Sequence, residues 1–167
     1  MITCVQALEL AELMWPEFIT EGPAVFLRTS RRGALQPIST FPDLVAAEAF
    51  VNHVHLLDAL EHDATLPEEP FWNPRHPDFK SGLRLASSVA ECWAAKLAQE
   101  FPKRQFAVFA TRDDNPVVRF HSVVPDLPLW LEPSEFPHGS VLCIIVASGR
   151  IERRLGSLMP EKDDSEG

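Results

Sequence analysis

One long helical pattern followed by three strand patterns constrains the fold of this chain more than any other feature. Over residues 81–100 the apolar side chains recur at helical spacing. Alternating apolar residues then predict strands over 105–111 and 117–124, joined by the turn-forming residues 113–116. A third strand is expected over 141–147, where every residue is apolar, as in an interior strand. No helical pattern separates these strands, so they predict an antiparallel sheet.

The first half of the chain predicts a helix near its beginning. Thr3 and Gln6 can form a capping box at the start of a helix over residues 4–15. The apolar face of this helix is broad, so we expect the helix to be well buried. A short strand is expected over 24–28 and a loop over 30–42. The apolar face comprises Val5, Leu8, Leu10, Leu13 and Met14.

The segment over residues 43–60 is compatible with two structures. Its apolar residues follow helical spacing from Leu44 to Leu60, but residues 50–56 also alternate like a strand. We favour a helix over 43–60, because the periodic run is too long for one strand. The proline-containing segment 61–79 is expected to be a long irregular loop.

Together these elements predict an α+β fold, with an antiparallel sheet of three to four strands and two to three helices packed on one face. A length of 167 residues fits one domain, which we place at residues 1–159. Residues 160–167 are acidic and are expected to form a disordered tail.

Composition and charge favour some partners over others. The formal net charge of −9 repels phosphate backbones, so no nucleic-acid partner is expected. The longest apolar run is too short to span a bilayer, so no membrane association is expected either. The three cysteines are widely spaced and form no pairing motif, which is typical of a reducing compartment. We therefore expect a cytoplasmic protein.

Histidines and carboxylates between residues 48 and 62 are candidate metal ligands. If this segment is helical, Glu48, His55, Asp58 and His62 form one polar stripe with Asn52. Such a stripe could bind a metal or hold an acid–base pair, or it could be the solvent-facing side of an amphipathic helix. His53 and His55 could share an ion only if the backbone there is extended.

Two further groups of residues are candidates for binding a ligand or partner. Arg119 and His121 fall on one face of the expected strand over 117–124, where they could bind a carboxylate or phosphate or pair with a nearby aspartate. Trp72 and Trp130 lie in the two proline-rich loops. They could be exposed anchors for a partner or covers over the ends of the core.

No motif for a catalytic nucleophile, a phosphate loop, dinucleotide binding or a zinc finger is present. We therefore expect a small acidic protein-binding module, acting as an inhibitor, an adaptor or a subunit of a complex, rather than an enzyme. No cofactor is expected, and the expected partner is another protein, with a basic surface that its charge would attract. The alternatives are a metal-binding protein or enzyme that uses the stripe over 48–62, or a small-ligand pocket between sheet and helices.

Overall fold

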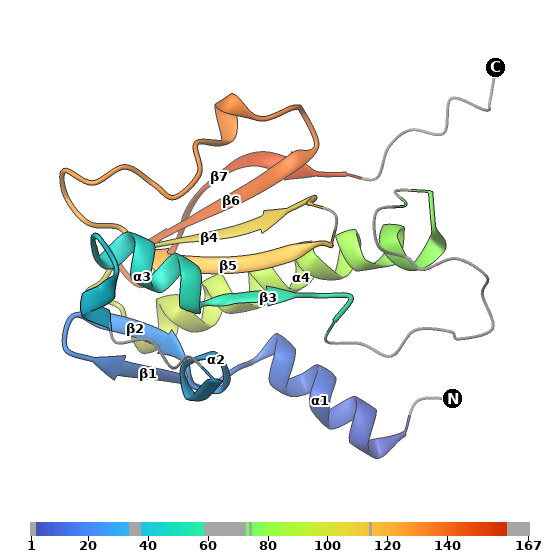
Figure 1. The fold of residues 1–167 in the computed structure, drawn as a ribbon, viewed down its shortest axis with the longest axis horizontal. Helices are drawn as coiled ribbons and strands as arrows, with labels where there is room; N and C mark the ends of the chain where they lie inside the picture. Colours follow the sequence, from blue (N-terminus) through green and yellow to red (C-terminus); the bar gives the residue numbers. More distant parts are fainter. Residues whose placement is uncertain (1–2, 34–37, 59–72, 74, 114, 160–167) are drawn as a thin grey trace.

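The computed structural model describes residues 3–33, 38–58, 73, 75–113 and 115–159. Within this part of the chain, a five-stranded antiparallel sheet has the strand order β3-β5-β4-β6-β7, and β1 and β2 form a separate hairpin (Figure 1). The fold is therefore α+β, as predicted. The elements are α1 (Cys4–Met14), β1 (Phe18–Glu21), β2 (Ala24–Leu27), α2 (Arg28–Gly33), η1 (Ile38–Thr40), α3 (Leu44–Val51), β3 (His53–His55), α4 (Pro77–Glu100), β4 (Phe106–Thr111), β5 (Val117–Ser122), η2 (Pro133–Glu135), β6 (Ser140–Ala147) and β7 (Arg150–Leu158).

The sheet contains the three predicted strands, β4, β5 and β6, and two further strands, β3 and β7. β4 and β5 form the expected antiparallel hairpin, and β6 is an interior strand between β4 and β7. A two-residue turn joins β6 to β7, and its residues Ser148 and Gly149 both have positive φ angles, as a type I′ hairpin turn requires. β7 was not predicted, because as an edge strand it is largely exposed and rich in charged residues. The prediction of three to four strands was therefore too low.

The long helix α4 covers one face of the sheet and forms the main core with it. His76 accepts a hydrogen bond from the Asp78 N–H and Pro77 occupies the first turn, so the helix begins four residues earlier than predicted. The predicted apolar stripe is buried, and its alanines let the helix lie close to the strands. The α4 side of this core consists mainly of Ala86, Val89, Ala90, Trp93, Ala94 and Leu97, packed against Phe106, Val108, Val118, Phe120, Leu142 and Ile144.

The opposite face of the sheet, here called the loop face, is covered partly by the connection over residues 123–139. Phe109 and Cys143 are fully buried there, and Leu129 and Leu131 of the connection pack against them. Burial raises the pKa of the Cys143 thiol to about 12, so this cysteine stays protonated and unreactive at neutral pH. A proline-rich segment predicted as a loop thus supplies the second layer over part of the sheet.

Helix α3 attaches β2 to the sheet through two side chains that lie four residues apart. The Glu48 carboxylate accepts a hydrogen bond from the Val25 N–H at 2.7 Å and from both the N–H and the hydroxyl of Ser122. Asn52 accepts from the Leu27 N–H at 2.9 Å and donates to the Val25 carbonyl at 2.8 Å. These side chains satisfy backbone groups of β2 that a neighbouring strand would otherwise bind. The buried polar pair therefore joins the hairpin to the sheet.

The predicted helix over residues 43–60 is correct only for its first half. α3 ends at Val51, and residues 53–55 pair with β5 as the edge strand β3. In this extended backbone Val54 packs against the main core, while His53 and His55 point to the loop face. Pairing with the open edge of β5 therefore overrides the helical spacing of the apolar residues.

Helix α1 and its capping box are confirmed, but the prediction that it is well buried is wrong. None of its residues is buried, and only Leu13 and Met14 near its end pack against the main core. The Trp93 indole N–H donates to the Leu13 carbonyl at 2.8 Å and fixes the end of the helix to α4. Figure 1 shows α1 leading away from the β1–β2 hairpin toward the N-terminus. The helix thus lies on the surface.

Replacing Trp93 with phenylalanine should release α1. The variant keeps most of the apolar volume but loses the hydrogen bond to Leu13, and we expect a loss of about 1–3 kcal/mol in the free energy of unfolding. Cleavage by a glutamate-specific protease at Glu9 and Glu12 should become faster. Chemical denaturation and limited proteolysis measure both effects, with Trp130→Phe as the exposed control. Unchanged cleavage of α1 would show that Trp93 does not hold it.

Candidate functional site

The residues of the predicted metal stripe do not share one face, because the segment is not one helix. Glu48 is fully buried in α3, His55 lies in β3, and Asp58 lies in the following turn, where it accepts a hydrogen bond from Asn115 at 3.0 Å. His62 lies outside the described residues. No group of three or more histidine, cysteine, aspartate or glutamate side chains in the described part of the chain is placed to hold a metal ion. The expectation of a continuous polar stripe is therefore wrong.

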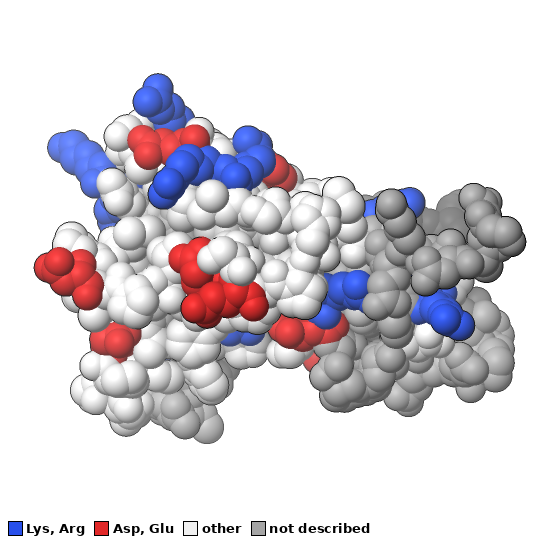
Figure 2. All heavy atoms as spheres, turned by 90° about the horizontal axis from the view of Figure 1, so that it is seen from above, with Lys and Arg blue, Asp and Glu red and all other residues white. Residues whose placement is uncertain are grey.

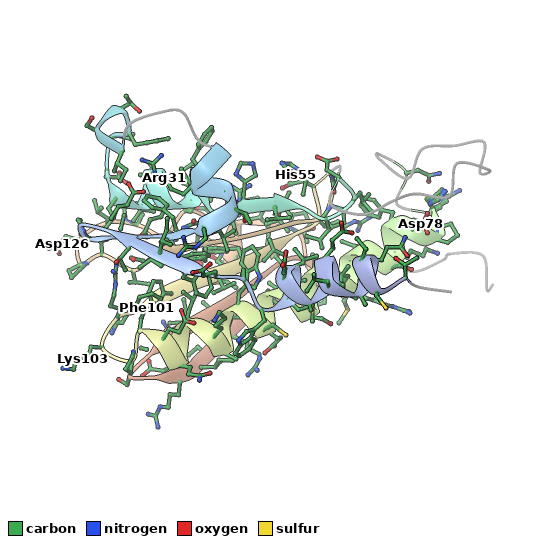
Figure 3. All side chains as sticks on the ribbon, turned by 90° about the horizontal axis from the view of Figure 1, so that it is seen from below. Arg31, His55, Asp78, Phe101, Lys103 and Asp126 are labelled. Carbon is green, nitrogen blue, oxygen red and sulfur yellow. The ribbon has the colours of Figure 1, made fainter. Side chains whose placement is uncertain are left out.

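His53 and His55 instead meet the condition for a shared site, because their backbone is extended. Their rings are in edge-to-face contact with centroids 5.2 Å apart, and Figure 3 shows His55 on the side of β3 away from α4. The imidazole of His53 hydrogen-bonds the Phe50 carbonyl through Nδ1 and faces Arg119 across the β3–β5 pair. Burial lowers the pKa of His53, and the charge of Arg119 lowers it further. His53 is therefore neutral near pH 7.

Three of the four residues predicted to bind a ligand or partner lie together on the loop face. The Arg119 guanidinium lies over the Trp130 ring, 5.8 Å from its centroid. The backbone N–H of Trp130 donates to Nε2 of His121 at 3.2 Å, and the His121 ring stacks on Phe109 with centroids 5.6 Å apart. Trp72 lies outside the described residues. The sequence thus placed Arg119 and His121 on one face correctly, and the loop brings Trp130 to them.

Trp130 is neither a simple cover over the core nor a free anchor. Its neighbours Leu129 and Leu131 pack into the loop face, while Trp130 itself is 39% exposed above Arg119. The ring of Phe50, which is 51% exposed, contacts His53 at a centroid distance of 5.9 Å. We call the group of Phe50, His53, His55, Arg119 and Trp130 the Arg119 surface.

Arg119 is a largely desolvated cation at the centre of β5, the strand next to the edge strand β3. Burial lowers its pKa, and its Nε is buried without a hydrogen-bond partner. The predicted pairing with Asp113 is not present, because that carboxylate accepts a hydrogen bond from the Thr111 hydroxyl and acts on Arg119 only at longer range. Asp114 lies outside the described residues. Among the described residues, Arg119 thus has an aromatic neighbour but no carboxylate in ion-pair contact.

A second candidate site lies beside α1, where the sequence predicted buried core. Val5, Leu8 and Trp15 are 65%, 59% and 48% exposed. Next to them is a pocket of about 460 Å³ whose floor is formed by apolar side chains of four elements. We call this pocket the α1 groove; it is lined by Glu9, Glu12, Leu13, Trp15, Pro16, Glu17, Leu27, Arg28, Thr29, Val54 and Trp93.

The rim of the α1 groove is mainly acidic. Glu9 and Glu12 line it from α1, and Glu17 lines it from the start of β1. Arg28 also lines the groove and forms an ion pair with Glu17. An apolar floor with a net negative rim is suited to a group that is apolar and positively charged.

A pattern in the sequence could have revealed this surface. Leu8 and Trp15 are seven residues apart and fall on the same side of a helix, whereas Leu10 and Met14 fall on another side, so the apolar residues exceed one buried stripe. Treating the broad apolar face as a sign of deep burial overlooks the apolar residues that do not fit in one buried stripe. Part of that face contacts α4 and the rest stays exposed.

No protein-family model matches the chain, and no curated protein or solved structure matches it significantly. In the described part of the chain, no helix is both long enough and apolar enough to cross a membrane. Any functional interpretation therefore depends on the geometry of the two surfaces.

Proposed function

We propose that this protein is a binding module that holds a basic, apolar segment of a partner protein in the α1 groove. The single observation that carries the proposal is the exposed apolar side of α1 beside a groove with an acidic rim. Large apolar residues that gather on one exposed surface typically mark a site of association. An inhibitor, an adaptor or a subunit of a complex would all use such a site.

The chemistry of the groove defines the partner. Apolar side chains of the partner would cover Trp15, Leu8 and the floor of the groove, as in helix-in-groove recognition. Lysine or arginine residues beside them would face Glu9 and Glu12. A partner with a basic surface also suits the net charge of −9, which speeds its approach. A nucleic acid does not suit this charge.

The distribution of charge also supports a localised site. Figure 2 views the side formed by β7 and the β5–β6 connection, where several basic side chains gather at one end with acidic ones among them, and a larger acidic patch lies near the centre of the face. The net charge is therefore not spread evenly, and the rim of the α1 groove is one acidic patch on another side of the molecule.

A cytoplasmic location is part of this proposal. The three cysteines are unpaired, and Cys4 is exposed at the beginning of α1. An exposed thiol beside a binding surface persists best where thiols are kept reduced.

A peptide titration tests the proposed function. The probe is a short helical peptide with leucines on one side and lysines beside them, and its charge-inverted counterpart carries glutamates at the lysine positions. Fluorescence anisotropy should show binding of the basic peptide in the micromolar range and at least about tenfold weaker binding of the acidic peptide. Binding of the basic peptide should also weaken as salt is added.

Three variants locate the binding. Leu8→Ser and the double variant Glu9→Lys/Glu12→Lys change exposed residues of α1, so both should fold normally and lose at least about tenfold in affinity. Met159→Ser removes an equally exposed apolar side chain from the end of β7 and should bind as the wild type does. Equal binding of both peptides, or binding that survives both α1 changes, would contradict the proposal. Displacement of the peptide by small neutral compounds alone would instead indicate a small-ligand pocket.

A further inference from the structure

We propose that the Arg119 surface is a separate binding site for a ligand that carries a carboxylate or phosphate group next to a planar ring. The site lies on the loop face, whereas the α1 groove lies beside α4 and the β1–β2 hairpin. Its occupation does not depend on the proposed function. The protein would thus bind two ligands of opposite charge at two places.

The charge of Arg119 is not balanced by a neighbouring anion among the described residues. The residue is central in β5, and its neighbours in register are His53 on β3 and Phe109 on β4, neither of which is an anion. A cation withdrawn from water costs free energy unless an anion or hydrogen-bond acceptors compensate it. The described residues supply the face of Trp130 but no carboxylate in contact, and Nε has no acceptor. An oxyanion would supply the missing interaction.

Contacts within the protein hold the site in place before any ligand binds. The Arg119 guanidinium lies near the Trp130 ring, and the loop that carries Trp130 is held by a backbone hydrogen bond to His121 and by two partly buried leucines. His121 is itself fully buried and stacked on Phe109. The planar guanidinium presents its N–H groups in one plane, which matches the two oxygens of a carboxylate or phosphate. Little ordering is left for the ligand to induce.

Aromatic side chains border the site. Phe50 and Trp130 expose large parts of their rings, and His53 and His55 lie between Phe50 and the strand that carries Arg119. Exposed aromatic side chains near a cation favour a ligand with a planar ring over a compact ion. The expected ligand therefore carries a planar ring beside its oxyanion.

A metal ion is the main competitor for the two histidines. Two imidazoles that share a tetrahedral zinc ion, at Zn–N distances of about 2.0–2.1 Å, have ring centres about 5 Å apart. The observed separation of 5.2 Å would permit this arrangement. However, the guanidinium that faces His53 repels a cation and attracts an anion, and the described residues add no third ligand. The charge of Arg119 therefore favours the anion.

Titrations with small probes test the proposal on the full-length protein. Phenyl phosphate and benzoate represent the two oxyanions on a ring, inorganic phosphate and cyclohexanecarboxylate lack the planar ring, and zinc tests the competitor. Calorimetry should show that phenyl phosphate, benzoate or both bind with a dissociation constant of about 1 mM or below. The two ring-free anions should bind at least about threefold more weakly, and zinc should not bind in this range.

Matched variants connect the binding to the residues. Arg119→Met keeps the aliphatic part of the side chain but removes the charge, and should lower the affinity for the ring-bearing anions at least about tenfold. Arg153→Met removes an exposed arginine of β7 and should have no effect. Trp130→Ala should lower the affinity for phenyl phosphate and benzoate more than the affinity for inorganic phosphate. The variant Glu9→Lys/Glu12→Lys should bind the anions as the wild type does.

Different results would contradict different parts of this proposal. Binding that survives Arg119→Met, or no binding of either ring-bearing anion up to about 10 mM, overturns the site. Zinc binding that His53→Ala abolishes overturns the choice of an anion over a metal. Equal affinity for phenyl phosphate and inorganic phosphate overturns the requirement for a ring. Circular dichroism of each variant shows that the fold is intact, and Arg119→Lys, which keeps the charge, should retain part of the affinity.

Discussion

Replacing Glu48 with alanine should destabilise this protein more than the loss of any exposed charge. The variant leaves the buried N–H groups of Val25 and Ser122 without an acceptor and removes the carboxylate next to Arg104. Each buried donor without a partner costs about 1–3 kcal/mol, so we expect a loss of about 3–5 kcal/mol in the free energy of unfolding. Urea denaturation at pH 7 measures the loss. Glu91→Ala, which removes an exposed ion pair with Arg154, is the matched control and should change stability only slightly.

The pH dependence of Glu48 gives a second measurement of the same site. Burial raises the pKa of Glu48 above its ordinary value of 4.5, and the hydrogen bonds from Ser122 and Val25 and the charge of Arg104 oppose this rise only partly. The native state therefore holds the proton more tightly than the unfolded chain. The part of Glu48's contribution that comes from this tighter proton binding is fully present below pH 4.5 and is lost as pH rises through the pKa of the folded state, whereas its hydrogen bonds still contribute at pH 7.

Glu48→Gln separates charge from hydrogen bonding. Its amide has one acceptor oxygen, so its NH₂ group must face a backbone donor, and we expect a loss of about 1–3 kcal/mol near pH 5. The loss relative to the wild type should become smaller as pH rises, because the wild type alone then carries a buried charge. A loss that grows with pH would show that the native state prefers the charged carboxylate, contrary to this account.

Gly156→Ala should have the second largest effect. Gly156 lies in β7 with a φ angle of +68°, and a Cβ atom there would lie 2.2 Å from the Val141 carbonyl oxygen of the neighbouring strand. The left-handed conformation costs an alanine about 1–2 kcal/mol, and the clash with backbone requires β7 to shift away from β6. We therefore expect a loss of about 3 kcal/mol or more, together with faster amide exchange in β7.

Gly22→Ala is the matched control for the conformational cost. Gly22 has a similar φ angle of +59°, but nothing lies within 4 Å of the position of its Cβ. This variant should lose only about 1 kcal/mol. If the two alanine variants lose the same amount, the contact with Val141 contributes nothing and the prediction for Gly156 fails.

The elements that the sequence predicted well are those determined by local patterns. α4 is long and regularly amphipathic, and the β4–β5 hairpin combines alternation with turn residues. β1 and β7 were not predicted, because each is short or exposed and gains its structure from one neighbour. The helix predicted over 43–60 was half wrong for a similar reason. Whether 53–55 becomes a strand depends on an edge of β5 that lies more than sixty residues further along the chain.

In the candidate sites, too, local patterns predicted some residue positions correctly and could not predict others. The two-residue period of a strand placed Arg119 and His121 on one face, and the structure agrees. No local pattern could place Trp130 over Arg119, because that contact depends on the path of the 123–139 connection. Glu48 looked like a surface ligand in the sequence, whereas it is an internal acceptor for two separate strands. Tertiary context decides the role of such a polar residue.

The attachment of β2 through side chains also determines which parts of the molecule can open together. Val25 and Leu27 are protected by Glu48 and Asn52 rather than by a neighbouring strand, so their amides lose protection when α3 detaches. Phe18, Val25 and Leu27 of the hairpin also pack in the main core with Trp93, so the hairpin is held both by α3 and by this core. Leu27 lines the α1 groove, and Asn52 at the end of α3 binds its backbone N–H. Detachment of α3 would therefore loosen one wall of the α1 groove.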